Sequence, residues 1–321
     1  MARRGVDLLR NGATVTVSIS IVVRTKNRPE YLSRAVRSIT SQTFADWQAV
    51  IVNDGGDPEP VDAILEAIAP HLRERFTVIH SPSSRGRWAS ANAGVLATQA
   101  PLLVLHDDDD TWSPDFLARA NEYMQQHPER DAVVSRIEIV WEERAGDEFE
   151  VIRSEVFQPQ LHDLLLSDAL LFNRFVPIGF VYRRRLHEEL GLFREALPVI
   201  GDWDFNLKVL ARGPLEFLGP TPLVQWRQRE SSSGDDGNSV IDASDDHEKY
   251  DALLRDEQLR TYVAANGPGL VLYLTKFIDR RLVEVENGIR AEIARASPLR
   301  QLKNRARRRF LRFGKRDGED E

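Results

Sequence analysis

Between Val15 and Ala100 the chain alternates short apolar segments with segments of helical pattern, and this alternation limits the fold more than any other feature. Short, continuously apolar strands separated by helices are typical of a parallel sheet that is covered on both faces. We therefore expect an α/β fold with a mostly parallel sheet. The expected strands are Val17–Val23, Trp47–Val52, Phe76–His80 and Leu102–Leu105, and the expected helices between them are Glu30–Gln42, Asp62–Arg73 and Arg87–Gln99.

The pattern becomes less regular after Asp110 and ends in a helical segment. We divide the chain into a domain over residues 15–240, with halves at 15–110 and 111–240, and a helical accessory segment over 245–321. That segment is interrupted at Asn266–Gly269, where glycine and proline break the helical pattern. Within the second half we expect a helix at Pro114–His127, a strand at Ala132–Glu142 that extends the sheet, a polar turn at Arg144–Glu148, and helices near Leu161–Leu171 and at Asp202–Ala211.

The composition is that of a globular protein with a real core. The chain has 321 residues, of which 42% are hydrophobic, and this is enough for one large domain with an appendage. The absence of cysteine excludes disulfides and thiolate chemistry and fits a cytoplasmic location. We expect neither a signal peptide nor a membrane span, because the basic N-terminus lacks an apolar core and Leu164–Tyr182 is interrupted by charged residues and proline.

Positive charge gathers at the C-terminal end of a chain whose formal net charge is −7. Residues Arg295–Arg316 include ten Arg or Lys and no Asp or Glu, with leucine and phenylalanine between them. An amphipathic helix on an anionic membrane surface is one interpretation of this pattern. A solvated basic end is the other, and nucleic-acid binding is not expected.

Four consecutive aspartates, Asp107–Asp110, directly follow the apolar segment 101–106. Neighbouring carboxylates repel one another by roughly 1 kcal/mol per pair at about 4 Å in water. A divalent cation shared with a phosphate-bearing ligand would offset this repulsion, because Mg²⁺ and Mn²⁺ are usually held by one or two carboxylates and substrate phosphates. The alternative is an acidic turn before the helix that starts near Pro114. Ligands of parallel sheets bind beyond the carboxyl ends of the strands, where two more polar clusters fall, at residues 25–28 and 53–57.

Four short segments in order resemble the motifs of family 2 glycosyltransferases, and the resemblance extends over residues 17–230. They are Val22–Arg28, Ile51–Gly56, Leu105–Asp110 and Gly201–Phe205. The resemblance implies a GT-A fold, a nucleotide-diphosphate sugar donor, Mn²⁺ or Mg²⁺, and inversion of the anomeric centre. It also implies a glycan or glycolipid acceptor in bacterial surface polysaccharide or glycolipid biosynthesis, at the inner face of a membrane.

The resemblance carries over to single residues. It implies that Asp202 is the catalytic base and that Asp109, with Asp107, binds the metal. Each role has a structural alternative: Asp202 is also a suitable helix N-cap, and a tryptophan such as Trp203 is as common in a core. The implied nucleotide-sugar site comprises Thr25, Asn27, Asp54, Arg87, Asp107 and Asp108, and the implied acceptor site comprises Trp203 and Asp204.

The chain departs from the family pattern at three points. Lys26 stands where many relatives have an aromatic residue that stacks on the base, and Asn53 replaces a frequent aspartate. Arg229 stands where many relatives have a histidine, which in some of them ligates the metal, and His106 and His247 are weak substitutes for it. Two competing functions remain, a haloacid-dehalogenase-type phosphatase using Asp108 and Asp110, and a non-catalytic scaffold at a membrane.

Overall fold

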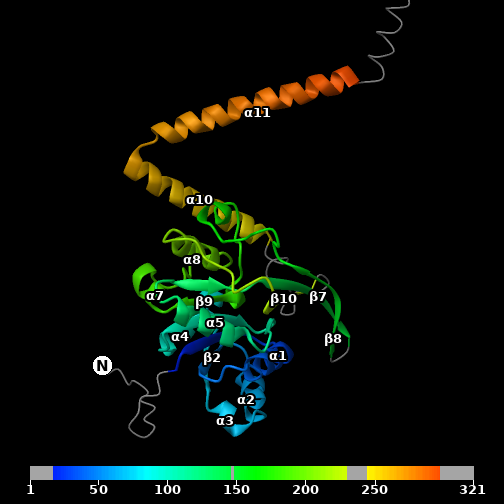
Figure 1. The fold of residues 1–321 in the computed structure, drawn as a ribbon, viewed down its shortest axis with the longest axis vertical. Coiled ribbons are helices and arrows are strands. Elements are labelled where there is room, and N and C mark those ends of the chain that lie inside the picture. Colours follow the sequence, from blue (N-terminus) through cyan, green and yellow to red (C-terminus); the bar gives the residue numbers. More distant parts are fainter. Residues whose placement is uncertain (1–16, 146–147, 230–243, 297–321) are drawn as a thin grey trace, which may run out of the picture. The chain divides into compact units, whose positions relative to one another are not determined.

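The computed structural model describes residues 17–145, 148–229 and 244–296 (Figure 1). The chain divides into two compact units, residues 1–252 and residues 253–321. The first unit contains two sheets, and the described part of the second consists of helix.

The large sheet has six strands in the order β3-β2-β1-β4-β9-β6. The first four pair in parallel, whereas β9 is antiparallel to both β4 and β6. Every residue of β1 is buried, as expected for a central strand with both faces covered. The bounds are β1 Ile19–Thr25, β2 Trp47–Asn53, β3 Phe76–His80, β4 Leu102–Asp107, β6 Ala132–Val134 and β9 Phe180–Arg183.

Helices lie on both faces of this sheet (Figure 1). The long amphipathic helix α1 buries Leu32, Val36 and Ile39, which join the core formed by β1 and β2. Helix α4 packs on β1 and β2. The bounds are α1 Pro29–Thr40, α2 Pro58–Glu66, α3 Pro70–Arg73, α4 Arg87–Ala97, α5 Phe116–Gln126, α6 Leu166–Ala169, η1 Pro177–Gly179, α7 Arg185–Leu190 and α8 Gly201–Leu210.

A second sheet of four strands stands beside the acidic segment, in the order β5-β10-β7-β8. Strands β7 and β8 form an antiparallel hairpin, and β10 runs parallel to β7. The pairing of β5 with β10 joins this sheet to the chain directly after the four aspartates. The bounds are β5 Thr111–Trp112, β7 Ile137–Ala145, β8 Glu148–Val156 and β10 Val224–Gln228.

Three expected elements were wrong in extent. The helix expected over Asp62–Arg73 is two helices, because the residue before Pro70 cannot stay helical and α3 begins at the proline itself. The strand expected over Ala132–Glu142 is divided between the two sheets, with β6 in one and β7 in the other. Only α6 forms in the segment Leu161–Leu171.

The described part of the C-terminal segment, residues 244–296, is helical as expected, and residues 297–321 of the expected segment lie outside the described residues. Helix α10 covers Ser244–Asn266 and α11 covers Gly269–Ala296, with the break where the sequence places glycine and proline. Gly267 takes a φ of +75°, which favours glycine. No helix in the described residues is long and apolar enough to cross a membrane. Nearly all of the basic segment Arg295–Arg316 lies outside the described residues.

Gly94 offers a test of how tightly α4 packs on β1. A Cβ atom at this position would come within 2.2 Å of Val22 Cγ1, in a fully buried part of the core. We expect Gly94→Ala to lower the free energy of unfolding by about 1–3 kcal/mol through overpacking. This corresponds to a fall in Tm of roughly 2–4 °C per kcal/mol for a unit of this size.

The matched control is Gly213→Ala, where a Cβ atom would meet no other atom within 4 Å. Its free energy of unfolding should stay within about 1 kcal/mol of the parent value. Equal urea midpoints for Gly94→Ala and Gly213→Ala would contradict close packing of α4 on β1.

Candidate active site

A cavity of about 910 Å³ opens at the carboxyl ends of β1, β2 and β4, next to the start of α8. This is the edge of a parallel sheet where ligands are expected. Seven of the predicted site residues line it together, although they come from five separate parts of the sequence: Thr25, Asp54, Arg87, Asp107, Asp109, Asp202 and Trp203.

Among the described residues, three predicted site residues do not belong to this lining. Asn27 takes a positive φ of 52°, and its Oδ1 accepts a hydrogen bond from the Asp57 N–H at 3.1 Å. Asp108 is fully buried below the cavity. Asp204 is 3% exposed and forms ion pairs with Arg194 and Lys208, so its contacts are those of a structural residue.

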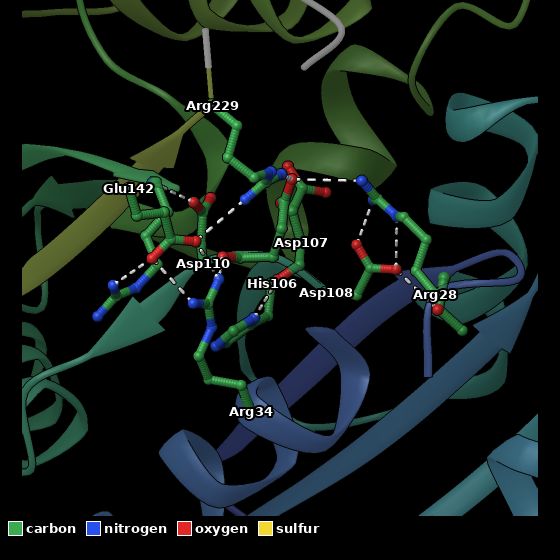
Figure 2. Close-up of polar contacts among 11 residues, drawn as sticks. Arg28, Arg34, His106, Asp107, Asp108, Asp110, Glu142 and Arg229 are labelled. Atoms are coloured by element: carbon green, nitrogen blue, oxygen red, sulfur yellow. Dashed lines mark hydrogen bonds and ion pairs between the residues drawn. The ribbon is translucent and has the colours of Figure 1, made fainter. Parts of the chain in front are cut away.

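The four aspartates are surrounded by arginine side chains (Figure 2). Arg24 pairs with Asp107, and Arg28 pairs with Asp108. Arg28 also reaches Asp109 at 3.3 Å. The repulsion among neighbouring carboxylates is thus offset within the protein by side chains from the end of β1.

Glu142 on β7 is the centre of a second group of ion pairs (Figure 2). It is 1% exposed and accepts four hydrogen bonds. Two come from Arg34 at 2.8 and 2.9 Å, one from Arg227 at 2.7 Å and one from Arg229 at 3.2 Å. Arg229 donates in addition to Asp109 at 2.7 Å. Through this residue Glu142 is connected to the acidic segment.

Burial and the arginines act differently on the four carboxyl groups. Burial raises the pKa of Asp108 to about 6, although Arg28 opposes the change. Burial also raises the pKa of Asp110 well above its ordinary value, and the nearby charges of Asp109 and Asp107 add to this effect. Burial alone would raise the pKa of Asp109, but the positive charges of Arg28 and Arg229 lower it below the ordinary value. Asp109 is therefore held ionised.

Asp107 and Asp109 retain donor atoms for a cation. Within the described residues, the arginine bonds to Asp109 go to Oδ2 and the bond to Asp107 goes to Oδ1. The other oxygen of each carboxylate remains for a ligand in the cavity that both residues line. The same described residues contain no cluster of three or more Asp, Glu or His that could hold a metal. Two carboxylates are nevertheless a ligand set that suits a hard cation, which would take its remaining ligands from water and phosphate.

Asp54 lies at the end of β2 and fixes the loop that precedes α4. Its carboxylate accepts hydrogen bonds from the Ser84 hydroxyl at 2.8 Å, from the Arg85 N–H at 2.8 Å and from the Gly86 N–H at 3.0 Å. Burial alone would raise the pKa of Asp54, but these bonds outweigh burial and lower it. Since Oδ1 accepts only one of the three bonds, it can accept another from a ligand.

Asp202 is the second residue of α8 and faces the cavity. Its Oδ2 accepts a hydrogen bond from Asn173 Nδ2 at 2.8 Å. Burial raises its pKa to about 6, in part against the positive charges of Arg87 and Arg24. The helix can start here because Gly201 has no side chain: a Cβ atom would come within 2.7 Å of Trp88 Nε1. A carboxylate with this pKa is ionised at neutral pH and can still accept a proton.

Two groups at the start of α4 have hydrogen-bonding capacity that the described residues do not use. Trp88 is 2% exposed, and its Nε1 has no hydrogen-bond partner there. The Arg87 guanidinium forms no ion pair with the described residues, and burial lowers its pKa. Both side chains line the cavity, so an anionic or hydroxyl-bearing ligand can satisfy them.

Several of these features were not predicted. His106 is buried and does not line the cavity, and burial lowers its pKa to about 4. The role of Glu142 gave no signal in the sequence, because it is one acidic residue within an alternating strand. Asn173 gave none either, since its contact with Asp202 joins residues that are distant in sequence.

Comparison with known proteins identifies the family. The model of glycosyl transferase family 2 matches residues 20–191, more than half of the chain. The chain is 34% identical over 193 residues to the uncharacterized glycosyltransferase YwdF of Bacillus subtilis (strain 168), which covers 60% of this chain and 68% of that protein. It is 32% identical over 199 residues to the PGL/p-HBAD biosynthesis glycosyltransferase of Mycobacterium bovis (strain BCG / Pasteur 1173P2), covering 61% and 71%.

Solved structures support the same fold at lower identity. S. aureus TarS 1-349 in complex with UDP-GlcNAc aligns with a TM-score of 0.54 at 17% identity, covering 67% of this chain and 60% of that one. The mannosyltransferase PcManGT from Pyrobaculum calidifontis, in complex with GDP-Man and Mn²⁺, aligns with a TM-score of 0.52 at 18% identity, covering 67% and 58%. The chain thus spans about three fifths of each of these structures. The expected fold is confirmed, and the chain belongs to glycosyl transferase family 2, whose members are nucleotide-sugar transferases.

Proposed function

We propose that the protein is an inverting, metal-assisted glycosyltransferase that moves a sugar from a nucleotide-diphosphate donor to an acceptor hydroxyl. The observation that carries this proposal is the shared cavity. A poised carboxylate, Asp202, lines it together with Asp107, Asp109 and Arg87, whose guanidinium forms no ion pair with the described residues. These are the groups that displacement of a nucleoside diphosphate requires, a base for the acceptor and positive charge for the leaving group.

Asp202 acts as the general base in this proposal. It takes the proton of the acceptor hydroxyl as the hydroxyl oxygen attacks the anomeric carbon, and the bond to the diphosphate breaks on the opposite side. One base and one displacement give inversion. Asn173 holds the carboxylate through its bond at 2.8 Å, so the orientation of the base is fixed before the acceptor arrives.

The donor lies along the ends of β1, β2 and β4. We assign its base to the end of β2, where Asp54 Oδ1 can accept an imide N–H. Thr25 and Asp107 line the stretch that follows, and Arg87 faces the diphosphate. A divalent cation held by Asp107 and Asp109, Mn²⁺ or Mg²⁺, would neutralise charge on the departing diphosphate.

A phosphatase of the haloacid-dehalogenase type is not favoured. Its nucleophile would be Asp108, which is fully buried and held by Thr25 and Arg28. A substrate phosphorus atom could not reach this carboxylate from the cavity.

We further propose that the enzyme works at the cytoplasmic face of a membrane, in biosynthesis of a bacterial surface polysaccharide or glycolipid. The basic segment Arg295–Arg316 supports this location, since each Lys or Arg near an anionic surface contributes about 1 kcal/mol. Helix α11, which precedes it, exposes large apolar side chains along its length, among them Phe277, Leu282 and Ile289. The similarity to glycosyltransferases named for PGL/p-HBAD biosynthesis supports a role in biosynthesis.

Substitution of Asp202 tests the base. We expect Asp202→Asn to abolish transfer and to leave nucleotide affinity within about threefold of the parent value, because the amide keeps the shape but cannot take a proton. The control is Asp163→Asn, an exposed aspartate outside the cavity lining, which should retain full turnover. Equal turnover in Asp202→Asn and the parent would remove this residue from catalysis.

The pH dependence follows from the raised pKa of Asp202. A base with a pKa of about 6 is ionised above that pH and protonated below it. The kcat/KM of the parent enzyme should therefore fall about tenfold per unit as the pH drops below 6. A flat profile between pH 5 and pH 7, in a range where the fold is intact by circular dichroism, would contradict the assignment.

Asp109 can be tested through the effect of metal on nucleotide binding. Calorimetry with UDP, GDP, dTDP and CDP, with Mn²⁺ and with a chelator, gives the metal-dependent gain in affinity. We expect the gain to be at least about tenfold in the parent and below about threefold in Asp109→Asn. The neutral amide keeps hydrogen-bond acceptors for Arg28 and Arg229. The same gain in both proteins would exclude Asp109 as a metal ligand.

Deletion of residues 295–321 tests the membrane location. Binding to vesicles that contain phosphatidylglycerol should weaken by about tenfold or more, because ten basic residues are lost. Transfer to a water-soluble acceptor should be unchanged, since the cavity is lined by residues of the first unit only. Vesicle binding that survives the deletion would refute the role of the basic segment.

A further inference from the structure

The cavity has two sides of different chemistry. Charged and hydroxyl side chains line the side formed by the ends of β1, β2 and β4. The side formed by the chain from β8 to α8, together with β10, is lined mainly by rings and aliphatic groups: Phe157, Phe172, Val176, Ile200, Trp203 and Trp226. A nucleotide diphosphate needs the first side. The second, apolar side is therefore available to a different ligand of the reaction, the acceptor.

Asp202 is connected directly to the apolar side. Trp203 directly follows it and Ile200 precedes it by two residues, and both of these line the cavity. Its hydrogen-bond partner Asn173 directly follows Phe172. An acceptor hydroxyl that reaches the Asp202 carboxylate therefore has the rest of the acceptor molecule next to these apolar groups.

The polar atoms around Asp202 on this side are already in use. Trp203 Nε1 donates to the Ala169 carbonyl at 2.8 Å, so only the ring of this tryptophan serves a ligand. Asn173 uses both ends of its amide, since Nδ2 donates to Asp202 and Oδ1 accepts from Asn206 at 2.9 Å. Sugar hydroxyls placed here would lose their hydrogen bonds to water without gaining hydrogen bonds to the protein. An aryl or alkyl group makes no hydrogen bonds that could be lost, and it would be stabilised by burial of its apolar surface.

Apolar side chains continue outward from the cavity along α6 and the residues after it. Phe172 lines the cavity and is 45% exposed, with the Arg174 guanidinium 3.7 Å from its ring centre. Leu165, the residue before α6, is also 45% exposed. Exposed apolar groups that run into a cavity are typical of a site for an apolar ligand. Glu248, near the start of α10, is a polar residue that also lines the cavity.

We propose that the acceptor is amphiphilic, with a hydroxyl-bearing head group that reaches Asp202 and an aryl or alkyl aglycone that lies against Phe172, Ile200 and Trp203. This inference rests on the proposed function, because it takes Asp202 to be the group that meets the acceptor hydroxyl. It excludes a free sugar as the preferred acceptor. The aglycone contributes binding through the hydrophobic effect and keeps the head group beside the base.

The test is a binding measurement with the full chain and a saturating nucleoside diphosphate. The intrinsic tryptophan fluorescence of the chain reports on ligands of the cavity, because Trp88, Trp203 and Trp226 line it. The probes are free glucose, galactose and mannose, their phenyl glycosides, and their octyl glycosides below the critical micelle concentration. We expect at least one phenyl or octyl glycoside to bind about tenfold more tightly than its free sugar. The phenyl and octyl arms distinguish an aryl from an alkyl aglycone.

Phe172→Ser should weaken the binding of that glycoside by about fivefold or more and leave the affinity for free sugars within about twofold. The matched control is Leu96→Ser on α4, which removes a side chain that is 71% exposed and lies outside the cavity lining. The Leu96→Ser variant should keep the full preference for the glycoside over its free sugar. Equal affinities for glycosides and free sugars, no binding of either, or an unchanged preference in Phe172→Ser would overturn the proposal.

The failure of this inference and the failure of the proposed function are distinguishable. Nucleotide binding is measured by calorimetry on the same preparations. A protein that binds no nucleoside diphosphate would lose the transferase assignment itself. A protein that binds the nucleotide but shows no preference for glycosides would lose only the amphiphilic acceptor.

Discussion

The ion pairs of Glu142 are the interaction on which the rest of this site depends. Three guanidinium groups, from α1, from β10 and from the residue after β10, converge on one carboxylate that is almost completely buried. Removing one partner of a buried pair typically costs 3–5 kcal/mol, because the charge that is left has neither water nor a counter-ion. Arg34 also donates to the Asp109 carbonyl at 2.7 Å, so the same cluster holds the backbone of the acidic segment. The second sheet is thereby fixed to the end of β4.

This arrangement explains how four consecutive aspartates can end a buried strand. Their charges are balanced by fixed arginines, and burial favours the neutral form of Asp108 and Asp110. Asp107 and Asp109 each keep an oxygen that accepts no arginine bond within the described residues, and both line the cavity. Asp110 also lines the cavity, but its Oδ1 accepts the Arg227 N–H at 2.8 Å and burial raises its pKa. The run of four is therefore functionally unequal. Two members serve the structure beneath the site, and two are available to a ligand above it.

The sequence predicted the parallel sheet well and its surroundings less well. Continuous apolar segments such as 19–25 have few alternatives to a buried strand, and each ends in polar residues that mark the ligand edge. The cavity lining was predictable for the same reason, since Asp54, Asp109 and Asp202 all follow strand ends or start a helix in known motifs. The strand expected over Ala132–Glu142 was divided in two, because its apolar pattern is the same whichever sheet it joins. Which sheet each part joins is decided by pairing with segments that are distant in sequence, and the local sequence pattern does not predict this pairing.

The arginine at position 229 links these observations to the role of the metal. A histidine in its place could ligate a cation, whereas a guanidinium has no lone pair to offer. Arg229 instead helps to hold Asp109, which lines the cavity, ionised through a bond to Oδ2. Its charge is permanent and does not depend on metal concentration. Part of the positive potential in this cavity is therefore built into the chain, and under the proposed function a bound cation would have to supply only the remainder for the diphosphate.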